Sequence, residues 1–118
     1  MAYQTGSATD IEDLVDKLRT FLSSNGWTQD QWDTVDNELT MHRTASLYFS
    51  MTWDDTNSED LAIYQHIGFN GANPIWGQPD DSGNGDTSYP IGTGRRVQFV
   101  SSGPYTAYYF FASTSAPY

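Results

Sequence analysis

The side chains best suited to hold a ligand lie in the glycine-rich stretch "DDSGNGD" at 80–86. Its carboxylates and its asparagine supply the oxygen ligands that a hard cation such as calcium prefers. The stretch lacks the glutamate at the twelfth position that completes an EF-hand loop, and Asp, Asn and Gly also build solvated turns. We therefore predict a candidate ligand loop with no resident metal or cofactor. The loop residues are Trp76, Asp80, Asp81, Asp86 and Tyr89.

The two histidines, His42 and His66, are the only imidazoles of the chain. A Ser/His/Asp arrangement needs a histidine oriented by a carboxylate beside a nucleophile on a strained turn, and neither histidine lies in such a motif. A zinc site needs three or four His, Cys or carboxylate ligands, and the chain has no cysteine. The glycines at 83–94 lack the spacing of a phosphate-binding loop.

Paired acids could divide the work of general acid and general base, as in glycosidases. The pairs Asp54/Asp55 and Glu59/Asp60 lie in a turn between two expected strands, where a solvated hairpin tip is the simpler interpretation. We predict no catalytic residues and no enzymatic activity. A small hydrolase that pairs a histidine with a carboxylate is the alternative.

The aromatic side chains are the strongest signal, at 15% of the chain. In "YTAYYFFA" at 105–112, alternation places Tyr105, Tyr109 and Phe111 on one face of a strand and Tyr108 and Phe110 on the other. Both faces need cover. We expect the N-terminal helix to cover one row and a partner molecule to cover the row centred on Tyr108 and Phe110. The predicted interface consists of Tyr105, Tyr108, Tyr109, Phe110, Phe111 and Tyr118.

Charge excludes two classes of partner. Five basic residues stand against fifteen acidic ones, which gives a net charge of −10. Such a chain is repelled by the phosphates of nucleic acid and by anionic membrane surfaces. No apolar run of about 18 residues and no secretion signal is evident, so we expect a soluble protein made without secretion.

These side chains are positioned by one helix and several strands. The segment 9–25 predicts a helix, because Thr9 and Glu12 have capping-box spacing and its apolar residues recur at helical intervals. Asn25 and Gly26 supply its stop.

After the helix the apolar period changes from 3.6 to 2. Strands are predicted at 38–42, 46–53, 61–69, 95–101 and 105–112, with a long loop at 70–94. The second and third strands should form one hairpin, and the last two another, around Gly103 and Pro104. Together the elements predict a single α+β domain over 1–118, with the N-terminal amphipathic helix on an antiparallel sheet of four to five strands.

Several stretches resemble virion structural proteins of tailed bacteriophages. The opening "MAYQTGSATDIEDLVDKLRTFLSSNGWT" is similar to their N-terminus, where a small-residue lead, an "LxxKLxxFL" helix and a "GW" stop recur. The stretches "SLYFSMTW", "WGQP" and "PYTAYYFFASTSAPY" are similar to later parts of those chains.

The resemblance implies a non-enzymatic component of the tail, neck or baseplate, located in the virion after synthesis in the host cytoplasm. Its partners would be copies of itself and other virion proteins, and no catalytic or binding residue is carried over. The alternatives are a capsid decoration protein at the particle surface or a carbohydrate-binding module, with Trp76 and Tyr89 stacking on sugar rings.

Overall fold

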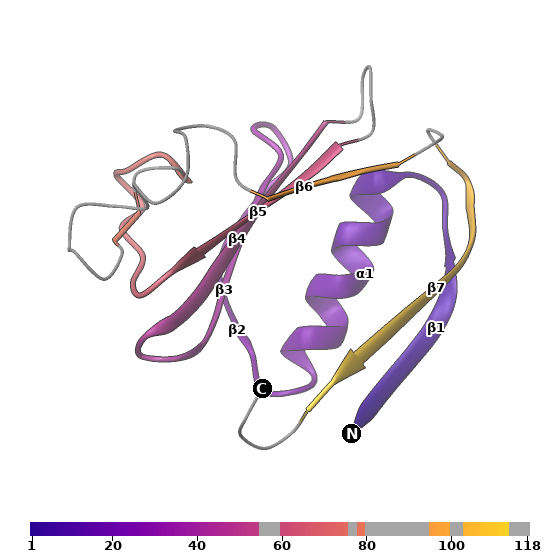
Figure 1. Cartoon of the computed structure of the whole chain (residues 1–118), viewed down its shortest axis with the longest axis horizontal. Helices are drawn as coiled ribbons and strands as arrows, with labels where there is room; N and C mark the ends of the chain where they lie inside the picture. The colour runs from indigo at the N-terminus through magenta and orange to yellow at the C-terminus, as the bar shows by residue number, and fades with distance from the viewer. Residues whose placement is uncertain (55–59, 76–77, 80–94, 100–102, 114–118) are drawn as a thin grey trace.

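The computed structural model describes residues 1–54, 60–75, 78–79, 95–99 and 103–113. Within these residues the chain forms one helix and seven strands (Figure 1). In chain order the elements are β1 (Ala2–Ala8), α1 (Ile11–Ser23), β2 (Thr28–Asp33), β3 (Glu38–Thr44), β4 (Leu47–Asp54), β5 (Asp60–His66), β6 (Arg95–Gln98) and β7 (Tyr105–Ala112).

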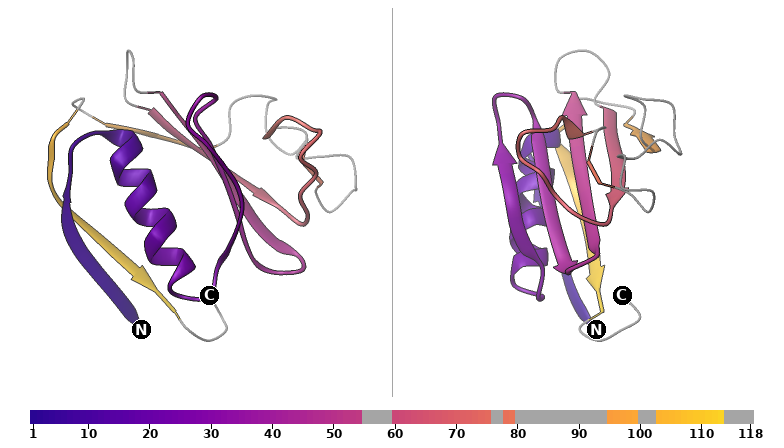
Figure 2. Two further views of the ribbon diagram at one scale, coloured as in Figure 1. Left: turned by 180° about the vertical axis from the view of Figure 1, so that it is seen from behind. Right: turned by 90° about the vertical axis from the view of Figure 1, so that its left-hand side faces the viewer.

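The elements form three layers, with the helix in the middle. An antiparallel five-stranded sheet has the order β2-β3-β4-β5-β6, and β1 pairs with β7 in a separate antiparallel ribbon. The helix lies between this sheet and the β1/β7 ribbon, as the left view of Figure 2 shows. The predicted α+β class, with an N-terminal helix packed on an antiparallel sheet, is confirmed.

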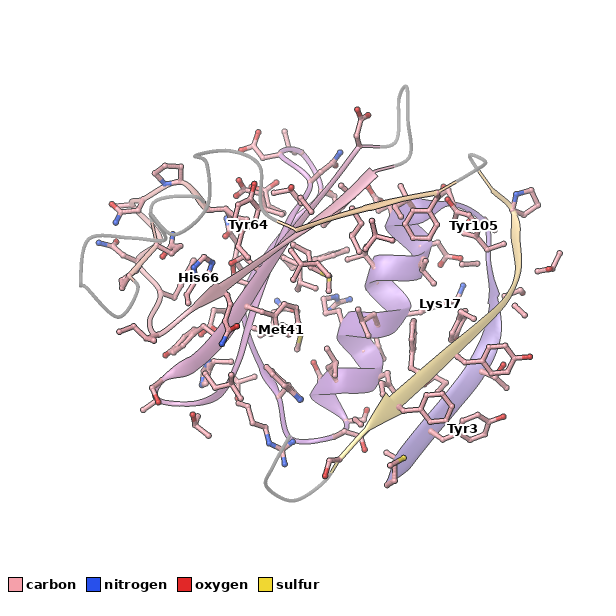
Figure 3. The ribbon with its side chains drawn as sticks, in the orientation of Figure 1. Tyr3, Lys17, Met41, Tyr64, His66 and Tyr105 are labelled. Carbon is pink, nitrogen blue, oxygen red and sulfur yellow. The ribbon has the colours of Figure 1, made fainter. Side chains whose placement is uncertain are left out.

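The apolar core lies between the helix and the five-stranded sheet. Ile11 and Val15 of the helix pack against Leu39, Met41 and Met51 of β3 and β4, and all five are buried. Period-2 alternation explains the sheet side, because the alternate residues Phe49, Met51 and Trp53 of β4 all face the helix. Figure 3 shows Met41 pointing from the sheet toward the helix.

The edge of this core at β2 is closed by stacked rings. Trp32 stacks on Trp53 with ring centroids 5.3 Å apart, and the Arg19 guanidinium lies 4.7 Å from the centroid of the Trp32 ring. Arg19 also bonds Asp16 on the helix and Gln29 on β2. The apolar stem of Arg19 thus covers the core edge while its charge stays paired.

The helix begins one residue later than its capping box predicts. Asp10, not Thr9, is the N-cap, and its carboxylate accepts a 2.8 Å bond from the Asp13 backbone N–H. Asp13 accepts in return from the Thr9 N–H and from Lys17, and these bonds hold the pKa of Asp13 below its usual value. The helix ends before Gly26, whose φ of 88° confirms the predicted left-handed stop.

Two strands were missing from the sequence prediction, and one hairpin was wrong. The strand β1 consists of small and polar residues, and the acids and glutamines of β2 hide its alternation. The predicted hairpin of 95–101 with 105–112 does not form, because β6 pairs with β5 and β7 pairs with β1. The predicted strand 61–69 ends at His66, and Ile67, the next residue, is exposed.

The capping geometry predicts different effects for two neighbouring substitutions. Asp10→Ala removes the cap acceptor and should lower the free energy of unfolding by about 1 kcal/mol. Thr9→Ala removes only an exposed hydroxyl 3.4 Å from Asp13, so we expect a change of less than about 0.5 kcal/mol. Urea unfolding of both variants measures the difference. A larger loss for Thr9→Ala would contradict the assignment of the cap.

Candidate functional site

The β1/β7 ribbon turns one row of aromatic rings inward and the other outward. Tyr108 is buried, and Phe110 stacks on it with centroids 4.4 Å apart. Phe110 also contacts Phe21 of the helix at 5.7 Å. The sequence prediction that a partner molecule covers Tyr108 and Phe110 is therefore wrong, because the chain's own helix covers them.

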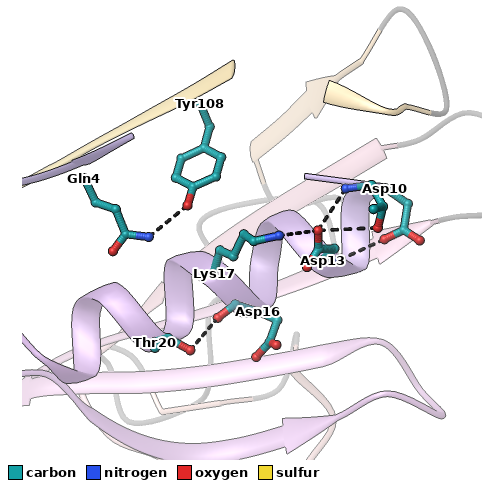
Figure 4. A network of polar contacts seen from close by, with 8 residues as sticks. Gln4, Asp10, Asp13, Asp16, Lys17, Thr20 and Tyr108 are labelled. Atoms are coloured by element: carbon teal, nitrogen blue, oxygen red, sulfur yellow. Dashed lines mark hydrogen bonds and ion pairs between the residues drawn. The ribbon is translucent and has the colours of Figure 1, made fainter. Parts of the chain in front are cut away.

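A close fit between two residues fixes this orientation. The Tyr108 ring lies over Gly6 of β1, so close that a Cβ at position 6 would lie 2.8 Å from the Tyr108 hydroxyl. The Tyr108 hydroxyl accepts a 2.8 Å bond from Gln4 Nε2 (Figure 4). The Thr5 hydroxyl donates to the Tyr108 carbonyl, also at 2.8 Å. A side chain at position 6 would therefore force the Tyr108 ring to shift.

Alternation fails at one end of the strand. The pairing register shifts between Gly6 and Ala8, so that Ala8 faces Tyr105. Tyr105 is half-buried and contacts Phe99 with centroids 5.3 Å apart, whereas strict alternation places it beside Tyr109 and Phe111. The predicted row of Tyr105, Tyr109 and Phe111 is thus broken by this irregularity, because an extra residue in one strand reverses the faces beyond it.

The outer face of the ribbon carries three exposed rings, which we call the aromatic strip: Tyr3 (59% exposed), Tyr109 (65%) and Phe111 (63%). Tyr3 and Phe111 are cross-strand partners with centroids 5.6 Å apart. Figure 3 shows Tyr3 on the side of the ribbon away from the helix. None of the 15 residues of β1 and β7 is charged.

The far face of the five-stranded sheet carries a buried polar row. Thr40 Oγ1 lies 2.6 Å from Ser50 Oγ, and Ser50 Oγ lies 3.1 Å from His66 Nε2. All three residues are buried, with His66 only 1% exposed. Burial lowers the pKa of His66 to about 4. Alternation places Tyr64 and His66 on this face, but gave no sign that it is covered.

The segment after β5 covers part of this face through Ile75 and Gln78. Ile75 packs on Ala62 and Tyr64. The buried Gln78 amide accepts from the Asn70 N–H at 2.7 Å and donates to the carbonyls of Asn70 and Asn73. A backbone bond from Ile67 to Pro79 closes the segment. The Gln78 side chain therefore pairs backbone groups of this turn that no helix or strand pairs, which explains the glutamine in "WGQP".

The other histidine lies two strands away on the same face. His42 Nδ1 is 2.8 Å from an Asp30 carboxylate oxygen, and its ring packs on Tyr48 with centroids 4.9 Å apart. Tyr48 is in turn the register partner of His66.

Glu38, the first residue of β3, accepts a hydrogen bond from the Gln31 side chain. Burial, together with the charges of Asp36 and Asp33, raises the pKa of the Glu38 carboxyl.

These contacts were missed by the sequence analysis, and they include two parts of a catalytic triad. His66 lies within hydrogen-bond distance of a serine, and His42 contacts a carboxylate. The two parts belong to different histidines, however. Ser50 is fully buried, and Nδ1 of His66 has no carboxylate partner among the residues described. Acyl transfer needs the serine and the carboxylate to contact the same imidazole, and the serine hydroxyl must be accessible to the substrate.

Other predicted site residues fall outside the described parts of the chain. They are the candidate ligand loop (Trp76, Asp80, Asp81, Asp86 and Tyr89) and Tyr118. Among the residues that the structure does describe, no group of three His, Cys, Asp or Glu side chains is placed to hold a metal ion. Within the same residues, no helix is both long and apolar enough to cross a membrane.

Comparison with known proteins gives no match: no protein-family model fits the chain, and neither the curated proteins nor the solved structures searched contain a significant relative.

The fit of Tyr108 over Gly6 predicts a sensitive position. Gly6→Ala should lower the free energy of unfolding by about 1–3 kcal/mol, because the new methyl group overlaps a ring that is already packed. Ser7→Ala, an exposed neighbour on β1, should change it by less than about 0.5 kcal/mol. Chemical unfolding of the two variants gives the comparison. Equal stability of Gly6→Ala and the wild type would show that the ring does not lie there.

The buried His66 predicts a specific loss of stability in acid. Between pH 6.5 and 4 the unfolded chain protonates this histidine and the folded chain does not, so the free energy of unfolding falls as pH falls. The expected contribution is on the order of 3 kcal/mol. His66→Gln keeps a hydrogen-bonding amide near Ser50 but cannot titrate, so the stability of this variant should fall less steeply over this range. Parallel curves for wild type and variant, measured by urea unfolding, would rule out a buried neutral imidazole.

Proposed function

We propose that the protein is a non-enzymatic structural component of a tailed bacteriophage particle, with the aromatic strip as its contact with neighbouring subunits. The observation that carries this proposal is the exposure of Tyr3, Tyr109 and Phe111 on an uncharged ribbon. The sequence resemblance to tail, neck and baseplate proteins supports the same role. The position within the particle is the tail, neck or baseplate, as that resemblance implies.

The size of the strip supports a protein contact. An aromatic side chain presents roughly 150–250 Å² of surface, so three rings at about 60% exposure leave on the order of 400 Å² open. Apolar patches of this size on a single chain are typically functional. A standard interface covers about 800 Å² per partner, so the strip amounts to about half of one side. Such a contact is weak alone and becomes effective when many copies are held in one particle.

The buried polar row favours a structural role over catalysis. Thr40, Ser50 and His66 are buried and are joined by two short contacts, from Thr40 to Ser50 and from Ser50 to His66. Hydrogen bonds among buried side chains fix the register of neighbouring strands, because a slipped strand leaves them unpaired. In this proposal the row aligns β3, β4 and β5, and it does not act on a substrate.

Glycan binding is the alternative use of exposed rings. Sugar sites combine such rings with a few convergent polar groups that bind hydroxyls. Among the outward side chains of β1 and β7, the polar groups are the hydroxyls of Thr5 and Ser7 and those of the tyrosine rings themselves, with no carboxylate or amide. This composition favours contact with another protein surface.

Incorporation into particles tests the proposal. In the phage that carries this coding sequence, mass spectrometry of purified particles should detect the chain. Replacing Tyr109 and Phe111 together by threonine should reduce incorporation at least ten-fold, because the contact loses its main apolar area. Threonine keeps the strand propensity at both positions.

Val35→Thr is the matched control, because Val35 is 90% exposed in the β2–β3 turn, outside the strip. This variant should be incorporated like the wild type. Particles that lack the wild-type chain, or that incorporate the double variant fully, would contradict the proposal.

A further inference from the structure

We infer that the aromatic strip packs against the same strip of a second copy of this chain, in a two-fold contact between the outer faces of two β1/β7 ribbons. The inference rests on the proposed function, because it identifies the neighbour that the strip contacts.

The distribution of charge favours a copy over an oppositely charged partner. The chain carries a net charge of −10, but β1 and β7 carry none. A surface that binds a basic partner carries acidic groups within the contact itself, since charge complementarity steers association. In the ribbon no such group is present. Two copies can therefore meet at the strip without burying an ionised side chain, which would be costly when unpaired.

The shape of the ribbon permits a two-fold contact. On its outer face, Tyr109 lies opposite Thr5 at the middle of the ribbon, and Phe111 lies opposite Tyr3 toward the chain termini. The small residues Ser7 and Ala107 occupy the other end and are exposed. Rotation about an axis that crosses the strands places the rings of one copy over the small residues of the other. Each ribbon thus offers both halves of an isologous contact.

The net charge gives this contact an unusual dependence on salt. Outside the strip the two copies repel each other, and salt screens this repulsion. Association should therefore strengthen with salt. A contact with a basic partner would weaken instead, because screening reduces an attraction.

Sedimentation velocity of the full chain from 10 to 500 µM, in about 0.02 M and 0.5 M NaCl, measures this dependence. We expect weak dimerisation that is at least ten-fold tighter in high salt. The double variant Tyr109→Thr/Phe111→Thr should remain monomeric, and Val35→Thr should dimerise like the wild type. Both altered residues of the double variant are exposed, so circular dichroism should show an unchanged fold.

Single-cysteine cross-linking locates the contact, because the chain has no cysteine of its own. Thr5→Cys lies at the centre of the strip, so a short bis-maleimide should link two copies across facing ribbons about 10 Å apart. Val35→Cys, in the β2–β3 turn, should give less than a tenth of that yield. Equal yields from the two variants would overturn the strip-to-strip contact.

A chain that stays monomeric at every concentration and salt would also overturn the inference. If the double variant is nevertheless lost from particles, the proposed function stands and the strip contacts a different virion protein. If neither dimerisation nor incorporation depends on the strip, both proposals fail.

Discussion

The fit of the Tyr108 ring over Gly6 determines which face of the ribbon is buried. Because successive side chains of a strand point to opposite faces, an inward Tyr108 requires an inward Phe110 and an outward Tyr109 and Phe111. Glycine at position 6 leaves room for the ring where it lies, and a Cβ there would force it to shift. Three features depend on this one packing arrangement. They are the exposed aromatic strip, the covering of the helix by the ribbon, and the contact proposed for assembly.

The helix is covered on two sides by layers of different chemistry. Toward the five-stranded sheet it presents Ile11 and Val15 in a dry core. On another side, Phe21 meets Phe110 of the ribbon. The Asp13–Lys17 pair remains partly exposed. The ribbon therefore contacts the helix through this pair of rings, while the Tyr108 hydrogen bond and the fit at Gly6 hold β1 and β7 together.

Much of this fold could be predicted where the pattern is local. The helix and its glycine stop follow from periodicity and capping, as does the core face of β4 with Phe49, Met51 and Trp53. The partner of β7 could not be predicted, because pairing between residues more than 100 positions apart leaves no local signal. The sequence analysis correctly found that β7 has two apolar faces, but alternation alone does not state which face the helix covers. The polar row was also missed, since alternation indicates on which face His66 lies and not that this face is buried there.

The central claim is that Tyr108 and Phe110 point toward the helix while Tyr3, Tyr109 and Phe111 face solvent. The most direct test is NMR of the assigned aromatic protons in dilute, low-salt solution with a soluble paramagnetic probe. The account predicts strong broadening of the Tyr3, Tyr109 and Phe111 ring signals and protection of Tyr108 and Phe110. Protection of Tyr109 and Phe111, with broadening of Tyr108, would contradict it.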